Sequence, residues 1–332
     1  MTMTLAQLIE MKLHEGPQLE VIKAVCEVAM REYAIKTTLD SLESDLKSVE
    51  FTIVKYKDSY NLYILRGLEE LMVGFEEFTM KVISLKSNAF AKPFAERITK
   101  IEREFRTVVD VLEEWIKTQR SWIYLEPIFS QKDLAKQMSH EATKFTQLDS
   151  FYRKELAQIK QDPQVHKYCR REHVLSSLQY VNKEFELISK GLTVYLESKR
   201  EHFARFYFLS NEEIIEILGQ MRDPKNVQRY LNKIFEGIDY LYFTPYGQIK
   251  GVFSKEDEFL PLKGSIDPRE TAESWLRDLE REMRIAVKTA IQSCYLDFRM
   301  RDFQTWVKAW QGQALTVVLS IILTESLKEI FE

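Results

Sequence analysis

The chain has 332 residues, of which 45% are hydrophobic and 30% charged, a balance typical of a globular protein that buries a core. Its formal net charge of −4 disfavours a nucleic-acid-binding role, which usually requires a basic face. Three widely spaced cysteines provide no disulfide framework, which is typical of a reducing compartment and predicts a cytoplasmic protein. The longest apolar run, residues 314–323, is far shorter than the roughly 20 residues of a membrane span.

Long amphipathic helices dominate the first part of the sequence. Only 10 glycines and 8 prolines occur in the chain, and so few breakers favour long helices over many short strands. Apolar side chains recur at intervals of three and four residues, which places each series on one helix face that neighbouring helices must cover. The pattern predicts antiparallel helix bundles. The three series are Ile35, Leu39, Leu42, Leu46, Val49 and Ile53; Leu68, Met72, Phe75, Thr79 and Val82; and Phe94, Ile98, Ile101, Phe105, Val108, Leu112, Trp115, Gln119 and Trp122.

Prolines and one aromatic cluster mark the expected breaks between helices. Pro127 and Pro163 lie next to periodic segments, where a missing N–H costs least. Residues 203–208 contain three phenylalanines and a tyrosine. Ser210 followed three residues later by Glu213 is the pattern of a capping box, which starts a helix. We therefore expect a joint between two helices at residues 203–210.

A β-prone insert interrupts the helical pattern. Short runs at residues 241–244 and 249–253 flank the turn sequence Pro-Tyr-Gly-Gln, and residues 259–262 follow a polar turn. These runs predict a hairpin or a three-stranded sheet within an otherwise all-α fold. Beyond the insert, Asp267 as N-cap and Pro268 as first helical residue predict the start of the next helix.

No catalytic motif is present in the sequence. It contains no phosphate-binding Gly-x-x-x-x-Gly-Lys-Ser/Thr loop, and the two glycines of residues 247–251 fit a hairpin turn better. His166, Cys169 and His173 are spaced to share one helical face, but three ligands from one helix are unusual for zinc. A packed or half-exposed helix face is the favoured interpretation of this cluster. We therefore predict no catalytic residue, no metal and no cofactor.

Several segments resemble the linker region of dynein heavy chains, in the order and spacing of that family. They are residues 113–129, 140–156, 203–218, 251–264 and 275–291, and the resemblance covers nearly the whole chain. Phe-Leu-Ser-Asn at residues 208–211 is closer to ciliary (axonemal) dyneins than to the cytoplasmic transport type. Two family features are missing, since Ala204 stands where a proline is common and residues 321–324 lack a tryptophan.

The resemblance implies a mechanical element without its own chemistry. The implied fold is all-α, an elongated, curved rod of antiparallel helix bundles with one small β-hairpin insert. In this family, nucleotide binding and hydrolysis in an AAA+ ring of the same heavy chain swing the linker between bent and straight forms, which moves the tail. The whole heavy chain would be a minus-end-directed microtubule motor ATPase, whereas this chain would bind no nucleotide. A static helical scaffold or interaction module without a power stroke is the alternative.

The resemblance also implies partners and a location. The AAA+ ring would be an intramolecular partner, and neighbouring dynein tail segments and chains would be further partners, with no nucleic acid and no membrane. We expect a cytoplasmic location in the axoneme of a cilium or flagellum. The expected division is an N-terminal bundle at residues 1–162, a central helical segment at 163–238, the insert at 239–266 and a C-terminal helical segment at 267–332 that ends before the ring.

Two sets of residues are candidates for mechanical roles. A hinge is expected at the strongest interruptions of the central helices, and ring contacts are expected from exposed aromatic, acidic and basic side chains. The acidic tip of the insert would be a docking knob, or alternatively the insert only covers apolar surface. The candidate hinge residues are Phe203, Ala204, Arg205, Phe206, Ser210 and Pro163. The candidate ring contacts are Tyr207, Phe208, Glu256, Asp257, Glu258, Arg170 and Arg171.

Overall fold

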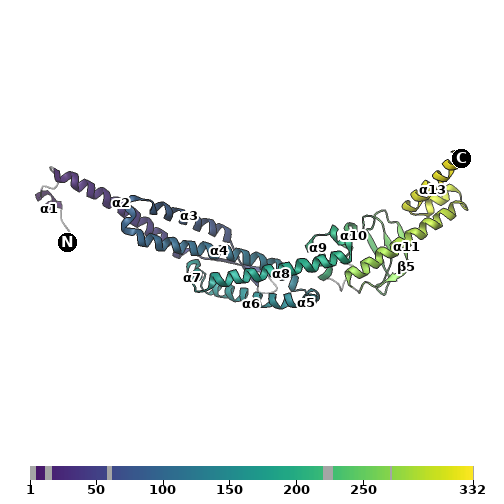
Figure 1. Ribbon diagram of the computed structural model, residues 1–332, viewed down its shortest axis with the longest axis horizontal. Coiled ribbons are helices and arrows are strands. Elements are labelled where there is room, and N and C mark those ends of the chain that lie inside the picture. The colour runs from purple at the N-terminus through teal and green to yellow at the C-terminus, as the bar shows by residue number, and fades with distance from the viewer. Residues whose placement is uncertain (1–4, 12–16, 58–61, 220–226, 270, 332) are drawn as a thin grey trace. The chain divides into compact units, whose positions relative to one another are not determined.

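The computed structural model describes residues 5–11, 17–57, 62–219, 227–269 and 271–331 (Figure 1). The chain forms two compact units. Unit 1 comprises Met1–Glu126 and Thr143–Ile188, and unit 2 comprises Pro127–Ala142 and Ser189–Glu332. The dividing points fall within the helices α4 (Ala95–Phe129), α6 (Ser139–Gln161) and α8 (Val174–His202). The four-segment division expected from the sequence stays a prediction.

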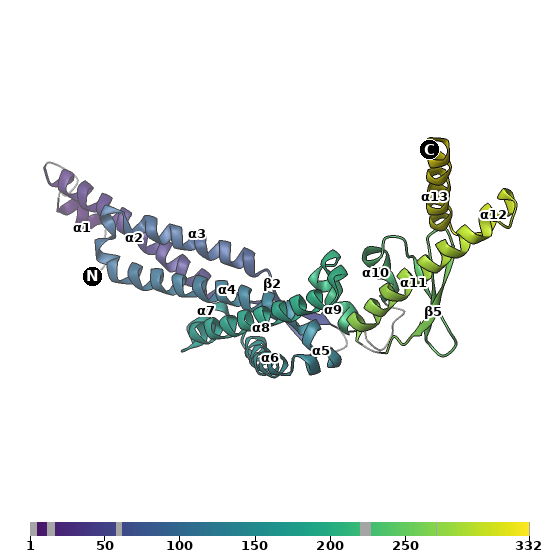
Figure 2. The same ribbon diagram turned by 45° about the vertical axis from the view of Figure 1, so that its right-hand side comes forward.

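Unit 1 consists mainly of helices. Helices α2, α3 and α4 run side by side in it (Figures 1 and 2). Besides its parts of α4, α6 and α8, its elements are α1 (Leu5–Glu10), α2 (Pro17–Ser48), β1 (Thr52–Lys57), β2 (Leu62–Arg66), α3 (Leu68–Lys86), the 3-10 helix η1 (Ala89–Phe94) and α7 (Val165–Cys169).

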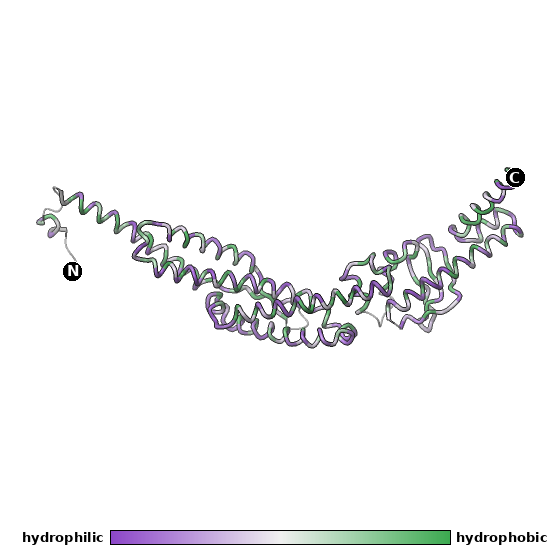
Figure 3. The backbone as a smooth tube through the Cα atoms, in the orientation of Figure 1, coloured by the Kyte–Doolittle hydropathy of each residue, from purple (hydrophilic) through white to green (hydrophobic). Residues whose placement is uncertain are grey.

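The core of unit 1 forms around α4, and the stripe predicted for this helix is confirmed. Phe75 of α3 packs on Phe105 with ring centroids 6.0 Å apart, and Tyr152 of α6 stacks on Trp122 at 4.4 Å. Figure 3 shows hydrophobic and hydrophilic residues alternating along the helices, as expected for helices that share a core. Members of the stripe that are at most 1% exposed are Ile98, Ile101, Phe105, Val108, Leu112, Trp115 and Trp122.

The first predicted stripe ends earlier than the sequence suggested. Helix α2 buries Leu39, Leu42 and Leu46 but ends at Ser48. The assignment of Ile53 to this helix was wrong, because Ile53 lies in β1 opposite Leu65 of β2. Thr52–Lys57 is rich in β-branched and aromatic residues, which fit a pleated, half-buried surface better than a helix.

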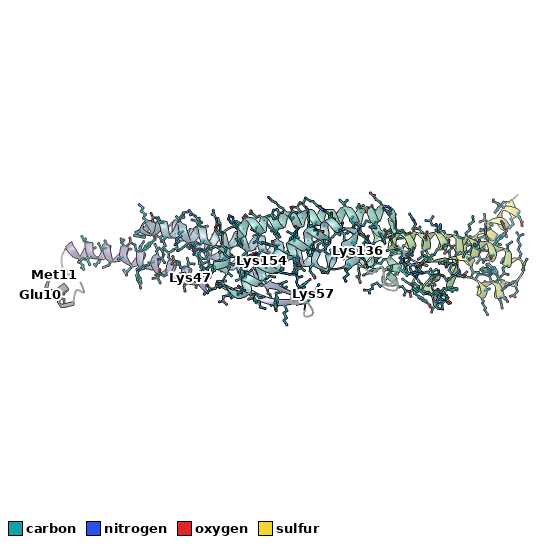
Figure 4. All side chains as sticks on the ribbon, turned by 90° about the horizontal axis from the view of Figure 1, so that it is seen from below. Glu10, Met11, Lys47, Lys57, Lys136 and Lys154 are labelled. Carbon is teal, nitrogen blue, oxygen red and sulfur yellow. The ribbon has the colours of Figure 1, made fainter. Side chains whose placement is uncertain are left out.

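A glutamine in the α4 stripe holds this small sheet. The Gln119 Oε1 accepts a hydrogen bond from the Leu65 N–H, and the Gln119 Nε2 donates to the Leu65 carbonyl, both at 2.8 Å. The Tyr152 hydroxyl donates to the same Oε1 at 3.1 Å. At the end of β1, Lys57 (labelled in Figure 4) pairs with the buried carboxylate of Glu126. Side chains of α4 and α6 therefore fix the position of the two strands.

Unit 2 combines helices with a second antiparallel sheet. Pro127 lies in the last turn of α4, and the break that the sequence predicted next to it follows at residues 130–131, before α5. Besides its parts of α4, α6 and α8, its elements are α5 (Lys132–Gln137), the 3-10 helix η2 (Ala204–Phe208), α9 (Asn211–Gly219), α10 (Gln228–Ile234), β3 (Tyr240–Phe243), β4 (Ile249–Phe253), β5 (Phe259–Ile266), α11 (Ala272–Phe298), α12 (Phe303–Ala309) and α13 (Gly312–Phe331).

The β insert is a three-stranded sheet in the order β3-β4-β5, as one of the two predicted forms had it. Helix α11 packs along β5 (Figure 2) and accepts a hydrogen bond from the Gly264 N–H on Glu282 at 2.9 Å. The predicted start of this helix was wrong. It begins at Ala272 with Thr271 as the N-cap residue, whereas Asp267 accepts a hydrogen bond from the Arg269 N–H in a turn.

The C-terminal helices of unit 2 share a separate apolar cluster. Cys294 of α11, Trp306 of α12 and Val318 of α13 are fully buried in it. The Trp306 indole N–H donates to the Cys294 carbonyl at 2.9 Å, which satisfies a buried polar group. The predicted all-α class is confirmed, with two small sheets in the described ranges where the sequence indicated one.

Candidate functional site

The predicted joint at residues 203–210 lies within unit 2 as a short 3-10 helix between α8 and α9. Phe203 and Leu209, on either side of η2, have extended backbones, with φ −140° and −110°, so the helical path stops at both positions. Phe203, Phe206 and Leu209 are buried, and the rings of Phe203 and Phe206 meet edge to face at 5.1 Å. Half of the aromatic cluster is therefore core that shapes the joint.

Arg205 connects the joint to two further helices of unit 2. Its Nη1 donates to the carbonyl of Ile234 at the C-terminal end of α10, at 3.0 Å, where a cation also complements the helix dipole. Its Nη2 lies 3.4 Å from the carboxylate of Glu280 on α11. The guanidinium is 4.9 Å from the ring centroid of Phe235, which in turn contacts Phe203. One candidate hinge residue thus joins η2 to both α10 and α11.

The restart of the helix follows the predicted capping box. The Ser210 N–H donates to Glu213 at 2.9 Å, and the Glu213 N–H donates to the Ser210 hydroxyl at 3.3 Å. The hydrogen bond from Lys233 of α10, followed by that from the Ser210 N–H, lowers the pKa of Glu213. Arg200 of α8 crosses the joint, because its Nη2 donates to the side chain of Asn211 at 2.8 Å.

The other half of the aromatic cluster faces outward. Tyr207 is 58% exposed and Phe208 is 66% exposed. The Tyr207 hydroxyl donates a hydrogen bond to Glu197, one of the last residues of α8, and this bond raises the pKa of Tyr207. Among the residues that the structure describes, no aromatic ring contacts Phe208. Phe208 is therefore available for a partner, while Tyr207 is partly engaged with its own chain.

A cavity of about 430 Å³ opens beside Arg205 within unit 2. Phe235, Met283 of α11 and Ala314 of α13 contribute apolar walls, and Gln311 contributes a polar one. A second open space of about 530 Å³ is lined by Arg205 and mainly by residues of α11, so the packing around Arg205 is incomplete at two places.

The acidic tip of the insert is more occupied than the sequence indicated. Asp257 adopts a left-handed backbone with φ 59°, and its carboxylate accepts a hydrogen bond from Tyr240 at 3.1 Å. Glu258 accepts from the Gly312 N–H at 2.9 Å and so caps the first turn of α13. Glu256 is exposed, and its side chain has no partner in the described ranges. Two of the three candidate docking acids therefore stabilise unit 2 itself.

The remaining candidates, Pro163, Arg170 and Arg171, belong to unit 1, whereas the joint belongs to unit 2. The Pro163 carbonyl accepts from the Phe51 N–H at 2.8 Å, which ties this interruption to the segment before β1. Arg170 pairs with Glu104 of α4 at 3.4 Å, and Arg171 pairs with Glu155 of α6 at 3.5 Å. These arginines fasten the turn between α7 and α8 to neighbouring helices.

The proposed single helical face of His166, Cys169 and His173 does not form. Helix α7 ends at Cys169, and His173 has a left-handed backbone with φ 66° in the turn before α8. Burial raises the pKa of the Cys169 thiol to about 12 and lowers the pKa of His166. Within the described ranges, no three metal-ligating side chains are grouped to hold an ion. Cys169 is buried as a packed helix face requires, whereas His173 is exposed in a turn, so the prediction that the three residues share one helix face was wrong.

Sequence reasoning missed three residues that organise the joint. Arg200 belongs to α8, Phe235 follows the end of α10, and Glu280 belongs to α11. Phe235 and Glu280 contact Arg205 although they lie 30 and 75 residues from it in the sequence. Periodicity reports which face a residue occupies but not its partner on another element. Arg200 alone had a local signal, since it lies in a basic last helical turn beside the break.

No helix within the described ranges combines the length and apolar character that a membrane crossing requires. The family model described as "Dynein heavy chain, N-terminal region 2" matches residues 1–294.

Curated relatives agree with this match. The chain is 37% identical over 311 residues to dynein axonemal heavy chain 1 of Rattus norvegicus, covering 94% of this chain and 7% of that protein. It is 33% identical over 317 residues to dynein axonemal heavy chain 3 of Mus musculus (95% and 8%) and 32% identical over 323 residues to dynein axonemal heavy chain 12 of Homo sapiens (96% and 10%). The chain therefore spans at most a tenth of these relatives, and it belongs to the dynein heavy chain family, in the segment described as N-terminal region 2.

Proposed function

We propose that this chain is the mechanical linker of an axonemal dynein heavy chain. It would swing with the nucleotide state of the AAA+ ring of the same heavy chain and transmit force to the tail. The observation that carries this proposal is the family match along residues 1–294. The helices add support, since α4 alone runs for 35 residues with a buried stripe, which suits an element that must resist bending. We propose the axoneme of a cilium or flagellum as its site of action, because the relatives that it resembles are axonemal dynein heavy chains.

We propose further that this segment moves without hydrolysing nucleotide, while the remainder of the heavy chain is the microtubule motor ATPase. The sequence carries no phosphate-binding loop, and the relatives are at least ten times longer than the aligned region. An ATPase assay of the 332-residue chain alone is expected to give no turnover above a buffer control. Steady turnover by the purified chain would contradict the proposed division of labour.

The joint at residues 203–210 is our proposed hinge, ahead of Pro163. Hinges are short element-terminal segments that absorb a change in backbone dihedral angles, and η2 is bounded by two extended residues. The cavity beside Arg205 leaves room for the packing to change. Pro163 is less suited to this role, because its own carbonyl and the N–H of Val165 are hydrogen-bonded to Phe51 and Val49.

A reversible cross-link across the joint tests this hinge in the full heavy chain. Arg200→Cys with Asn211→Cys, bridged by a cleavable bis-maleimide, replaces the 2.8 Å hydrogen bond that spans the joint. We expect ATP-driven microtubule gliding to stop on cross-linking and to recover on cleavage. The matched control is Asp278→Cys with Arg281→Cys, an ion pair at 3.1 Å within the single helix α11 that, among the described residues, has no contact with Arg205. Gliding that persists through the joint cross-link removes this joint as the hinge.

The alternative function is a static helical scaffold. It is supported by the burial of Phe203 and Phe206, because a fully packed joint would also suit a connection that does not move. The two functions differ in whether contacts change with nucleotide, because a ligand shifts an equilibrium only through differential affinity for the two states. Fluorescence energy transfer between a dye on Tyr246→Cys, a 90% exposed position of the insert, and a label on the ring of the same heavy chain should change between ATP-bound and nucleotide-free states. Constant transfer with intact ATPase activity would favour the scaffold.

The same labelled heavy chain tests the proposed ring contacts. Phe208 and Glu256 are the candidates that the structure leaves without partners in its described part, so we propose them ahead of Tyr207, Asp257 and Glu258. Phe208→Ala and Glu256→Lys should each alter the nucleotide dependence of the signal. Because neither side chain has a partner within the described chain, the stability of the segment should stay unchanged.

A further inference from the structure

A basic groove lies in unit 1 between α4 and the start of α8. Its volume is about 600 Å³. Lys100 and Arg103 of α4 and Arg170 and Arg171 of the α7–α8 turn line it, although the chain as a whole is acidic. We define these four cations as the basic groove.

Two of the four charges are uncompensated within the described chain. Arg170 is paired with Glu104, which also lines the groove, and Arg171 is paired with Glu155. Lys100 and Arg103 are exposed and have no carboxylate partner among the described residues. They lie three residues apart, so they are neighbours on one face of α4. Their charge is therefore available to a ligand.

The opposite wall adds neutral hydrogen-bonding groups. Ser176 and Gln179 belong to the first turns of α8, and Thr107 continues the face of α4 beyond Arg103. The positive end of the α8 dipole, at Val174, adds to the favourable potential for an anion. Cations spread along an open groove, with hydroxyl and amide groups facing them, match the repeated carboxylates and backbone amides of an extended chain better than one compact anion.

We propose that the basic groove binds an acidic polypeptide segment, rich in Glu or Asp, of a partner chain. A nucleic acid fits the groove less well, because its affinity comes from many phosphate contacts, whereas Lys100 and Arg103 are the two groove cations without a carboxylate partner among the described residues. The inference concerns a site in unit 1 and does not depend on the proposed lever function.

The test uses the 332-residue chain and a fluorescein-labelled poly-glutamate peptide, followed by fluorescence anisotropy. Raising the salt from about 0.1 M to about 1 M shortens the Debye length from about 10 to about 3 Å and should abolish most of the binding. Lys100→Glu with Arg103→Glu should weaken binding by about tenfold or more, since two attractive charges become repulsive. Both substitutions are at exposed positions of α4, and circular dichroism should report an unchanged helix content.

The matched control is Lys36→Glu with Lys154→Glu, which makes the same change in net charge at exposed positions of α2 and α6 (Lys154 is labelled in Figure 4). Peptide affinity in this control should stay within about twofold of the unmodified chain. Equal weakening in both double variants would overturn the proposal, since it would show a general charge effect. Absence of peptide binding, or tighter binding of single-stranded RNA or inorganic phosphate in competition, would overturn it too.

A photo-cross-linking version of the peptide locates the site independently of affinity. Cross-links identified by mass spectrometry should map to residues 100–107 and 169–179. Cross-links confined to other surfaces would contradict the assignment even if the peptide binds.

Discussion

Replacing Arg205 with alanine should destabilise unit 2 by about 2–3 kcal/mol. The substitution removes a charged hydrogen bond to the Ile234 carbonyl, which is worth about 1.5–3 kcal/mol, and a cation–π contact with Phe235, worth about 0.5–1 kcal/mol. The ion pair with Glu280 adds only about 0.2–1 kcal/mol, because both side chains are partly solvent-exposed. Contacts that share one side chain are not additive, so the expected loss lies below their sum.

Urea unfolding followed by circular dichroism, with hydrogen exchange of residues 228–234, measures this loss. With a slope of roughly 2–3 kcal/mol/M, the midpoint for unit 2 should fall by about 1 M, and exchange in α10 should accelerate. The control is Arg269→Ala. Arg269 is 78% exposed, and Asp267 is its one ion-pair partner among the described residues, so its removal should change stability by less than about 0.5 kcal/mol. An Arg205→Ala effect as small as that of the control would refute the view that Arg205 holds the joint together.

Three further predictions concern the joint and the insert. Phe206→Ala should cost about 3–5 kcal/mol because its ring is fully buried, whereas Phe208→Ala should cost less than about 0.5 kcal/mol, as thermal unfolding can show. Because folding lowers the pKa of Glu213, ionised Glu213 stabilises the folded state above its ordinary carboxyl pKa, and this stabilisation is lost as pH falls through the folded pKa. Glu213→Gln should therefore reduce the dependence of the free energy of unfolding on pH at acid pH. An unchanged pH dependence in this variant would contradict the assignment. Glu258→Ala removes the cap on the Gly312 N–H and should cost about 0.5–2 kcal/mol, visible as faster hydrogen exchange in the first turn of α13, while Glu256→Ala should leave that exchange unchanged.

The parts of the fold that the sequence predicted are those governed by local rules. The stripe from Ile98 to Trp122 follows from helical geometry, and the capping box at Ser210 and Glu213 follows from the need to satisfy the first amides of a helix. The misassignment of Ile53 has a physical cause as well. Its distance from Val49 fits a helix face, and only the β-branched and aromatic content of the following residues signals a strand.

The sequence predicted that the helix is interrupted at the candidate site, but it did not predict which side chains meet there. The sequence indicated where α8 ends and α9 begins, yet it could not separate buried Phe206 from exposed Phe208, because a 3-10 turn does not follow the helical period. The role of Glu258 was also beyond local rules, since its partner Gly312 lies 54 residues away. From the sequence alone, the acidic turn that contains Glu258 could be interpreted as a docking surface, because the position of α13 relative to it was not known.

The hydrogen bonds of Gln119 have a consequence for how the small sheet is aligned. A lone pair of strands is marginally stable in water and prone to slippage, and a shift of one residue would turn every side chain of β2 to the opposite face. A primary amide that engages both the N–H and the carbonyl of Leu65 recognises a single backbone position. The alignment of β1 and β2 is thus fixed by a side chain of the neighbouring helix α4. An insertion or deletion that shifted β2 by one residue would therefore break the hydrogen bonds of Gln119 before it disturbed the pairing between the strands.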